Sequence, residues 1–173
     1  MASELKNLSS YTPAEVPNGA EYRIGIVVSE YHSEITFALR DGAVETLLQN
    51  GVLRENIVVD YVPGAFELPL GAQLVFTGME CDAVIALGCV VKGDTEHDVY
   101  INTAVANELM MLGTEYEAPF VFGLLTTNTM QQAKDRSGGK LGNKGTECAV
   151  AALKMLALIE RCEVDEDDNS YLN

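Results

Sequence analysis

The sequence predicts one α/β domain, a three-layer sandwich in which helices cover both faces of a four-stranded parallel sheet. Short apolar runs rich in β-branched residues alternate four times with longer segments of helical spacing. These runs are apolar at successive positions, as strands of a sheet covered on both faces require. The chain has 173 residues, of which 47% are hydrophobic and 21% charged. That size and composition are typical of a globular domain that builds its own core.

The predicted elements follow one another in strand–helix order. Strands are expected at 22–29, 57–62, 83–91 and 120–125. Helices are expected at 34–50, 68–77, 95–112, 130–137 and 144–161. Ser33 is a plausible N-cap for the first helix, and glycines follow the first three long helices at Gly51, Gly78 and Gly113. Right-handed crossovers between these strands give a flavodoxin-like sheet of order 2-1-3-4.

Three regions differ in composition. Residues 1–20 are polar and lack periodicity, which predicts an N-terminal arm. Residues 21–162 form the predicted domain. Residues 163–173 hold five acidic residues and no basic one, which predicts an acidic tail.

Charge and cysteine usage exclude several classes of protein. The formal net charge is −15, with 26 acidic and 11 basic residues, so binding to nucleic acid or to an anionic membrane is not expected. The four cysteines form no CxxC pair and no Cys/His cluster, which argues against structural zinc and a redox motif. No apolar stretch reaches the length of a membrane helix, and no secretory segment is evident. A reducing cytoplasm is the expected compartment.

Candidate functional residues follow the predicted strands, because ligands of such sheets bind beyond the carboxyl ends of the strands. Tyr31 follows the first strand and can stack on a planar ring or simply shield the sheet edge. Phe66 and Glu67 follow the second strand, where a π face and a carboxylate can contact a ligand. Glu67 can equally act as a helix-capping acid.

The third strand leads into an apparent anion site. Gly93 leaves helix amides accessible, and Thr95 with Asp98 resembles a capping box. His97 in the first helical turn can transfer protons near neutral pH, although a lone histidine is more often a surface or core residue.

The fourth strand leads into a glycine-rich basic loop, in which Arg136, Lys140 and Lys144 look like phosphate ligands. The sequence contains no Walker loop and no GxGxxG motif, which argues against a protein that binds ATP or a dinucleotide. Spacing alone therefore predicts a ring platform, an anion site and a candidate acid–base histidine. It does not predict a reaction.

Five stretches carry a resemblance to a known family. They are, in chain order from residue 22 to about 160, IGIVVSEYHSEIT, VPGAFELP, DAVIALGCVVKGDTEH, PFVFGLLTTNTMQQAKDR and GNKGTECAVAALKM. Together they are specific, and the sequence resembles the 6,7-dimethyl-8-ribityllumazine synthase family. The resemblance implies a transferase of riboflavin biosynthesis that uses no metal and no organic cofactor. Its substrates would be 5-amino-6-(D-ribitylamino)uracil and 3,4-dihydroxy-2-butanone 4-phosphate.

The resemblance also implies roles for individual residues. His97 is the expected general acid–base. The expected pyrimidine and ribityl contacts are Tyr31, Ala65, Phe66, Glu67, Cys89, Val90, Val91 and Phe122. The expected butanone phosphate contacts are Asp94, Thr95, Arg136 and Lys144. Phe122 and Arg136 are expected from the neighbouring subunit.

The family's site lies between adjacent subunits of a pentamer, so a homo-oligomer is implied. The loop SGGKLGNKG after Arg136 is the short form that leaves room for a shell of twelve pentamers, with riboflavin synthase as a candidate partner. The chain departs from the usual pattern at three places, where Tyr31 replaces Phe or Trp, His32 replaces Asn, and Asp98 replaces an aromatic residue.

Two other functions remain open at this point. One is a non-catalytic shell-forming or flavin-binding protein on the same scaffold. The other is a flavodoxin-like electron carrier, which would need a phosphate-binding loop after the first strand. The segment SEYHSEIT has too few glycines and hydroxyl groups for such a loop.

Overall fold

The structure confirms the predicted fold class. A computed structural model describes residue 7 and residues 9–169, and the side chains of these residues as far as 163. Four parallel strands form one sheet in the order β2-β1-β3-β4. Their bounds are β1 Ile24–Ser29, β2 Ile57–Val62, β3 Ala83–Val91 and β4 Phe120–Thr127.

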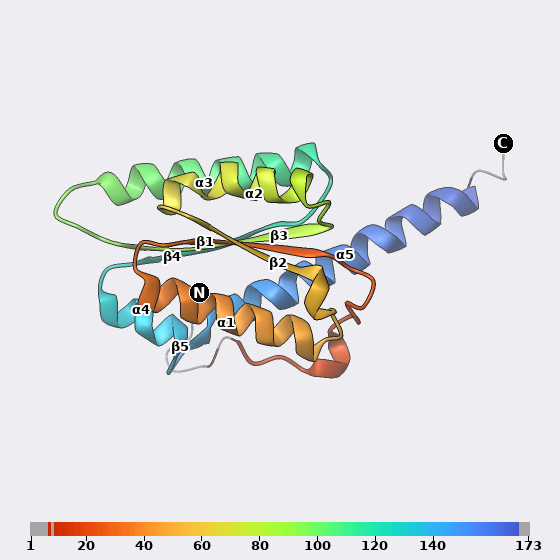
Figure 1. Ribbon diagram of the computed structural model, residues 1–173, viewed down its shortest axis with the longest axis horizontal. Coiled ribbons are helices and arrows are strands. Elements are labelled where there is room, and N and C mark those ends of the chain that lie inside the picture. Colours follow the sequence, from red (N-terminus) through yellow and green to blue (C-terminus); the bar gives the residue numbers. More distant parts are fainter. Residues whose placement is uncertain (1–6, 8, 170–173) are drawn as a thin grey trace.

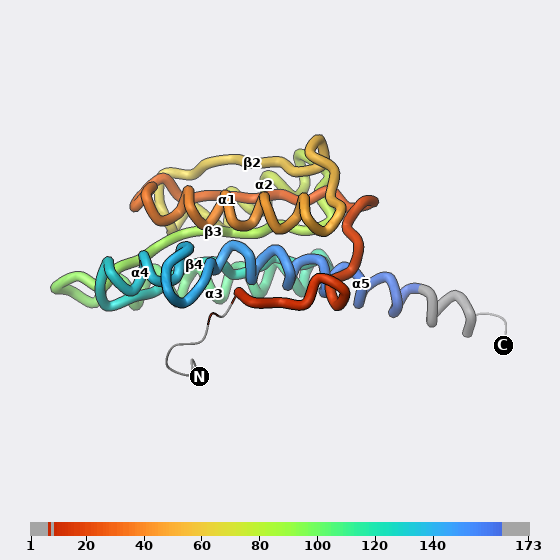
Figure 2. The backbone as a smooth tube through the Cα atoms, turned by 90° about the horizontal axis from the view of Figure 1, so that it is seen from below, coloured from red at the N-terminus to blue at the C-terminus, as the bar shows by residue number. Residues whose placement is uncertain are grey.

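Helices cover both faces of this sheet, as Figure 1 shows. One face carries α2 and α3, and the other carries α1, α4 and α5. In the view from below, α1 and α5 run side by side across the sheet (Figure 2). The helix bounds are α1 Ser33–Gln49, α2 Leu68–Gly78, α3 His97–Glu115, α4 Met130–Arg136 and α5 Lys144–Asn169. Within the described residues, no helix is both long enough and apolar enough to span a membrane.

Short elements connect these layers. In the part of the chain that the structure describes, 3₁₀ helices lie at Pro13–Glu15, Arg54–Asn56 and Ala65–Glu67. A small antiparallel pair, β5 (Ser137–Gly139) and β6 (Gly142–Asn143), lies in the glycine-rich loop between α4 and α5. This pair was not predicted from the sequence.

Two apolar cores hold the layers together, one on each face of the sheet. Alternate side chains of a strand point to opposite faces. Ile24, Ile26 and Val28 of β1 therefore enter the core under α1 and α5, while Val27 enters the core under α2 and α3. Gly145 allows α5 to start close to α1, because a side chain there would collide with the backbone of Leu39.

Several predicted helix ends are wrong. His32 precedes α1 as its cap, in the left-handed region at φ 57°, and its carbonyl accepts hydrogen bonds from Ile35 and Thr36; Ser33 is already helical. Helix α3 begins at His97 rather than 95, with no side-chain cap, so the predicted capping box of Thr95 and Asp98 does not form.

Other bounds extend further than predicted. Helix α3 passes through Gly113 to Glu115, since Leu109 and Leu112 keep it packed on the core. Helix α5 continues beyond the predicted end at 161 to Asn169, past the amino edge of the sheet (Figure 1). The predicted acidic tail therefore begins inside this helix, and residues 170–173 lie outside the described residues.

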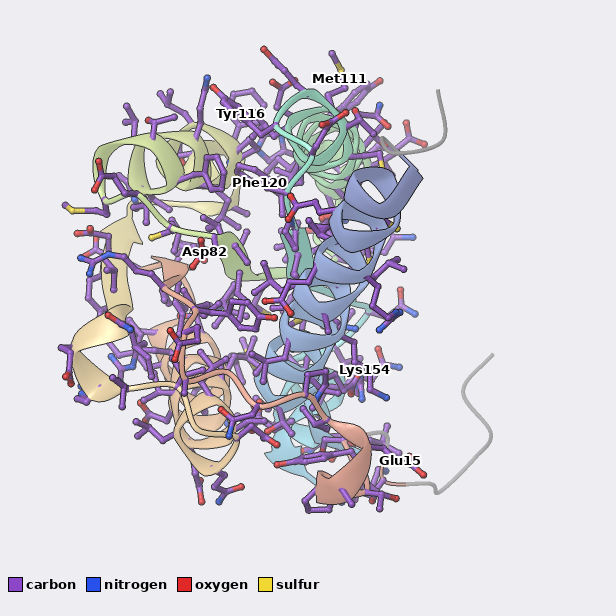
Figure 3. All side chains as sticks on the ribbon, turned by 90° about the vertical axis from the view of Figure 1, so that its right-hand side faces the viewer. Glu15, Asp82, Met111, Tyr116, Phe120 and Lys154 are labelled. Atoms are coloured by element: carbon purple, nitrogen blue, oxygen red, sulfur yellow. The ribbon has the colours of Figure 1, made fainter. Side chains whose placement is uncertain are left out.

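The α2–α3 face carries many exposed apolar side chains. At the amino edge, Phe76, Tyr116 and Phe120 stack with ring centroids 5.0–5.9 Å apart. Met111 points outward from α3 (Figure 3). The exposed apolar residues on α2 and α3 are Leu70, Leu74, Val99, Tyr100, Met110 and Met111. A patch of this kind on a small domain usually contacts another protein surface.

Candidate functional site

A hollow of about 440 Å³ lies at the carboxyl edge of the sheet, on the α2–α3 side. It is formed by the loops after β1, β2 and β3 and by the first turns of α3. Its lining residues are Tyr31, His32, Gly64, Ala65, Phe66, Glu67, Cys89, Val90, Val91, Gly93, Thr95, His97, Asp98 and Ile101. We call this hollow the main pocket.

The loop after β1 presents an aromatic ring to the main pocket. The Thr36 hydroxyl donates to the Ser29 carbonyl oxygen at 2.7 Å, which fixes the short turn between β1 and α1. Tyr31 is 69% exposed and meets the His32 ring edge-on, with centroids 4.6 Å apart. Its open face is therefore free to stack on a planar ligand.

The loop after β2 supplies a second aromatic ring and a carboxylate. Ala65 is buried and anchors the 3₁₀ turn, whereas Phe66 is 62% exposed. Glu67 caps α2 only by its backbone, because its side chain makes no capping hydrogen bond. This carboxylate is therefore free of the capping role and lies in the pocket wall.

The end of β3 forms the floor of the main pocket. Burial raises the pKa of the Cys89 thiol to about 11. The thiolate is the nucleophilic form of cysteine, so Cys89 stays protonated and inert near neutral pH. It contributes shape to the floor and no covalent chemistry.

Thiol reactivity tests this burial. Cys81, Cys89 and Cys148 are buried, and burial raises their pKa values to about 11, 11 and 12. Cys162 is exposed. One thiol per chain is therefore expected to react rapidly with a maleimide at pH 7, and Cys162→Ser is expected to abolish that reaction. A fast-reacting thiol in Cys162→Ser would contradict the burial of the other three cysteines.

Both histidines of the chain border the main pocket. His97 is the first residue of α3 and lies beside Gly93 and Thr95, where backbone amides at a helix start favour an anion. The Oδ1 atom of Asp98 is buried and has no hydrogen-bond partner among the described residues. The pocket thus combines ring platforms, an acid–base candidate and an anion-favouring helix start.

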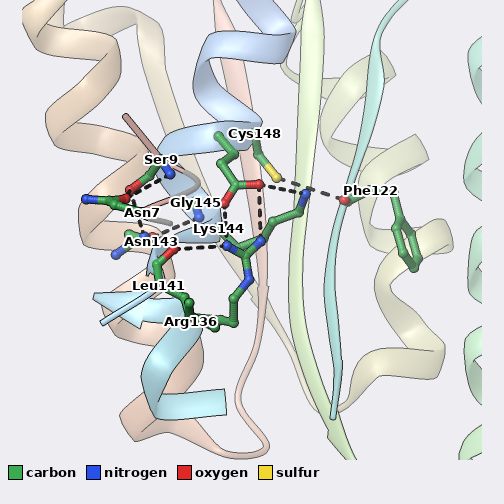
Figure 4. A network of polar contacts seen from close by, with 10 residues as sticks. Asn7, Ser9, Phe122, Arg136, Leu141, Asn143, Lys144, Gly145 and Cys148 are labelled. Carbon is green, nitrogen blue, oxygen red and sulfur yellow. Dashed lines mark hydrogen bonds and ion pairs between the residues drawn. The ribbon is translucent and has the colours of Figure 1, made fainter. Parts of the chain in front are cut away.

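A second polar cluster lies on the other face of the sheet, between α4 and α5. Arg136 Nη1 and Nη2 donate to the two carboxylate oxygens of Glu147 at 2.7 and 3.2 Å (Figure 4). Arg136 Nη1 also donates to the Leu141 carbonyl oxygen at 3.2 Å. Lys144 Nζ pairs with Glu147 Oε2 at 3.2 Å. We call Arg136, Lys144 and Glu147 the basic cluster.

A side-chain cap fixes the start of α4, the helix that carries Arg136. The Thr129 hydroxyl oxygen accepts from the Gln132 amide at 3.2 Å and starts α4, whose last residue is Arg136. Glu147 occupies one edge of the Arg136 guanidinium group.

Two of the five N–H groups of the Arg136 guanidinium, one on Nε and one on Nη2, make no hydrogen bond to a described residue. We call these two groups the free edge of Arg136.

The structure brings together some of the sequence-predicted site residues and separates others. Tyr31, Thr95, His97 and the predicted contacts at 65–67 and 89–91 share the main pocket. Asp94 does not line it, although both neighbours do. Phe122, Arg136 and Lys144 lie outside the main pocket of their own chain. Lys140 pairs instead with Asp135, at 3.2 Å.

Sequence reasoning missed three residues. Glu147 was not singled out, although its spacing from Lys144 puts the two side chains on one helix face. Ile101 follows His97 by one helical turn and so lines the same pocket. Asn143 directly precedes α5, inside the loop that was expected to bind phosphate, and its Oδ1 accepts a hydrogen bond from the Gly145 amide.

Fold and pocket together define an α/β protein of the flavodoxin-like class, with a ligand site at the carboxyl edge of a parallel sheet. Residues 21–160 match the family model of 6,7-dimethyl-8-ribityllumazine synthase. The chain therefore belongs to the 6,7-dimethyl-8-ribityllumazine synthase family.

Curated relatives agree with this assignment. The chain is 52% identical over 156 residues to the 6,7-dimethyl-8-ribityllumazine synthase of Parabacteroides distasonis, covering 90% of this chain and 98% of the relative. It is 48% identical over 163 residues to that of Phocaeicola vulgatus, covering 94% and 97%. It is 50% identical over 158 residues to that of Porphyromonas gingivalis, covering 91% and 98%.

Proposed function

We propose that this chain condenses 5-amino-6-(D-ribitylamino)uracil with 3,4-dihydroxy-2-butanone 4-phosphate. The products are 6,7-dimethyl-8-ribityllumazine, inorganic phosphate and two molecules of water. Family membership carries the proposal, and the main pocket supports it by combining two exposed aromatic rings with His97. The reaction makes the chain a transferase and requires neither a metal nor an organic cofactor.

The geometry suits the steps of this reaction. The pyrimidine stacks on Tyr31 and Phe66, with its edge toward Cys89, Val90 and Val91 at the pocket floor. An amine of the pyrimidine attacks the ketone, and water leaves as the imine forms. His97 moves protons to and from the carbonyl oxygen during this step.

Phosphate is then eliminated, which leaves an enol that tautomerises to a second carbonyl group. The second amine attacks this carbonyl, and the loss of a second water molecule closes the ring. The leaving dianion is held by the amides at Asp94 and Thr95 and by the guanidinium of Arg136. Most of the acceleration comes from holding both substrates together, as in other reactions of high effective molarity.

A mixing experiment tests the activity directly. Purified protein added to both substrates is expected to produce the fluorescence of the lumazine product, and omission of either substrate is expected to abolish it. A non-catalytic shell-forming or flavin-binding protein would give no product above the uncatalysed rate. Retention of His97, Arg136 and Glu67 in one chain favours the enzyme.

Arg136 is the proposed ligand of the phosphate group. Arg136→Lys is expected to raise the KM for the butanone phosphate about 10- to 100-fold, since a charged hydrogen bond contributes about 1.5–3 kcal/mol. A lysine offers a point charge in place of the free guanidinium edge. The KM for the pyrimidine is expected to change much less. Steady-state kinetics with each substrate varied in turn measures both values, and equal increases would contradict the assignment.

The protein is proposed to act as a homo-oligomer built from pentamers. The exposed apolar residues on α2 and α3 support a surface that another copy covers. Phe122 and Arg136 lie outside the pocket of their own chain, as expected if they serve a neighbour. The proposed compartment is the cytoplasm, and riboflavin synthase is a proposed partner.

The larger assembly is proposed to be a shell of 60 subunits. The loop SGGKLGNKG between α4 and α5 is the short form that the family resemblance associates with the shell, and it folds into the compact β5–β6 pair, which supports contact between pentamers. The net charge of −15 opposes close packing and is screened within about 8 Å at physiological salt. The shell is therefore expected to loosen at low ionic strength or high pH before the pentamers do.

Sedimentation at moderate salt measures this assembly. A species near the mass of twelve pentamers is expected, with pentamers released as salt is lowered. A single species of five chains, at every salt and phosphate concentration, would contradict the shell.

A further inference from the structure

We propose that the N-terminal arm, here the described residues 7 and 9–20, positions the basic cluster for phosphate binding through Asn143. The inference rests on the proposed function, because it assigns the arm a role at the phosphate end of that site. Asn7 and Ser9 are the arm residues that act. They contact no part of the main pocket and are positioning residues.

The first link joins the arm to the β5–β6 pair. Asn7 Oδ1 accepts hydrogen bonds from the Ser9 amide at 3.0 Å and from the Ser9 hydroxyl at 2.8 Å. The same hydroxyl oxygen accepts from the Asn143 backbone amide at 3.0 Å. Ser9 thus uses its donor toward Asn7 and its acceptor toward Asn143 (Figure 4).

The neighbouring glycine shows how closely the arm lies on the loop. Gly142 has a φ of 90°, which non-glycine residues rarely adopt. A side chain at this position would also collide with Asn7 and Ser9. The loop is therefore shaped to receive the arm.

The second link joins Asn143 to the start of α5. Asn143 Nδ2 donates to the Ala38 carbonyl oxygen of α1 at 2.9 Å, and its Oδ1 accepts from the Gly145 amide at 2.8 Å. An asparagine that satisfies an amide in the first turn is a typical helix N-cap. Asn143 therefore fixes the residue at which α5 begins and the orientation of the first turn of α5 relative to α1.

The third link is the first turn of α5 itself. Lys144 and Glu147 lie on one face of that turn, and Glu147 holds the guanidinium of Arg136 by two hydrogen bonds. A shift of Asn143 moves Glu147 and so turns the free edge of Arg136. Phosphate affinity depends on that edge, because a bidentate contact tolerates little misalignment.

The arm is also anchored away from the cluster. The Tyr11 hydroxyl donates to Gln49 Oε1 at 3.3 Å and accepts from Asn50 Nδ2 at 3.4 Å, at the end of α1. Between this anchor and α5 lies a hollow of about 350 Å³, and Glu147 lines it together with Ser9 and Tyr11. The arm and Glu147 thus border the same hollow.

Ser9→Ala tests the first link, with Ser10→Ala as the matched control. Ser10 is the next residue of the arm and makes no hydrogen bond to a described side chain. Ser9→Ala is expected to raise the KM for the butanone phosphate and the Kd for inorganic phosphate about 2- to 10-fold, the loss expected for one hydrogen bond. The KM for the pyrimidine and kcat are expected to stay within about twofold. Ser9→Thr keeps the hydroxyl and is expected to restore both values.

Calorimetric titration with inorganic phosphate separates this inference from the proposed function. Failure of the wild-type chain to form lumazine would refute the function, while the phosphate Kd of each variant would still report on the arm. Unchanged phosphate affinity in Ser9→Ala would overturn the inference. So would equal effects in Ser10→Ala, equal increases in both KM values, or absence of phosphate binding to the wild-type chain.

Discussion

His97→Ala is expected to slow lumazine formation by about 10²- to 10⁴-fold, the usual contribution of a general acid–base group. His97 begins α3 beside Gly93 and Thr95, so its imidazole borders the anion-favouring helix start at which the phosphate group is proposed to bind. The fold and assembly are expected to persist, because His97 is exposed and supplies no packing to either core. Single-turnover rates with both substrates saturating measure the change.

His32→Asn is the matched control, since His32 is the chain's other histidine and borders the same pocket. Its backbone is left-handed at φ 57°, a conformation that asparagine adopts readily. The variant is therefore expected to keep the turn after β1 and to retain activity within about tenfold, losing only a contact at the ring edge. A loss as large as that of His97→Ala would show that the proton shuttle has been assigned to the wrong histidine.

The strands could be predicted from sequence because their signal is local. A run such as IGIVVS is apolar at successive positions, and its short length and β-branched residues favour a strand buried on both faces. Parallel pairing and right-handed crossovers then favour the doubly wound strand orders, and the flavodoxin-like order 2-1-3-4 is one of them. The ends of the helices depend on backbone conformations and contacts that the local sequence pattern does not indicate. His32 caps α1 through an unusual backbone conformation, and no local pattern indicates that histidine would adopt it.

In the candidate site, too, some residues could be predicted from local sequence patterns and others could not. Residues of the main pocket follow directly from the rule that strand-end loops meet at one sheet edge. The pairing of Arg136 with Glu147 joins the end of one helix to the first turn of another, and it depends on where α5 begins. Asn143 and Ser9 set that start across 134 residues of sequence separation. Motif spacing carries no information about such a contact.

Two inactive variants are expected to restore activity when they share one assembly. Arg136→Ala removes both free N–H groups of the guanidinium and is expected to lower kcat/KM roughly 100-fold or more. His97→Ala is nearly inactive for the separate reason given above. If each site takes His97 from one chain and Arg136 from its neighbour, some interfaces of a mixed assembly contain both intact residues. Random mixing in a ring with one site per interface places both there in about a quarter of the interfaces.

Co-expression of the two variants at equal levels, with a different tag on each, measures this effect. The mixed assembly is expected to show about a quarter of wild-type activity, far above either variant alone. The matched control pairs His97→Ala with the double variant His97→Ala/Arg136→Ala, which leaves no interface with an intact histidine. The main pocket is formed by the loops after β1, β2 and β3 and by the start of α3, whereas the basic cluster lies between α4 and α5, so the two are separate within one chain. An inactive mixed assembly would contradict the shared site and require both residues to act within one chain.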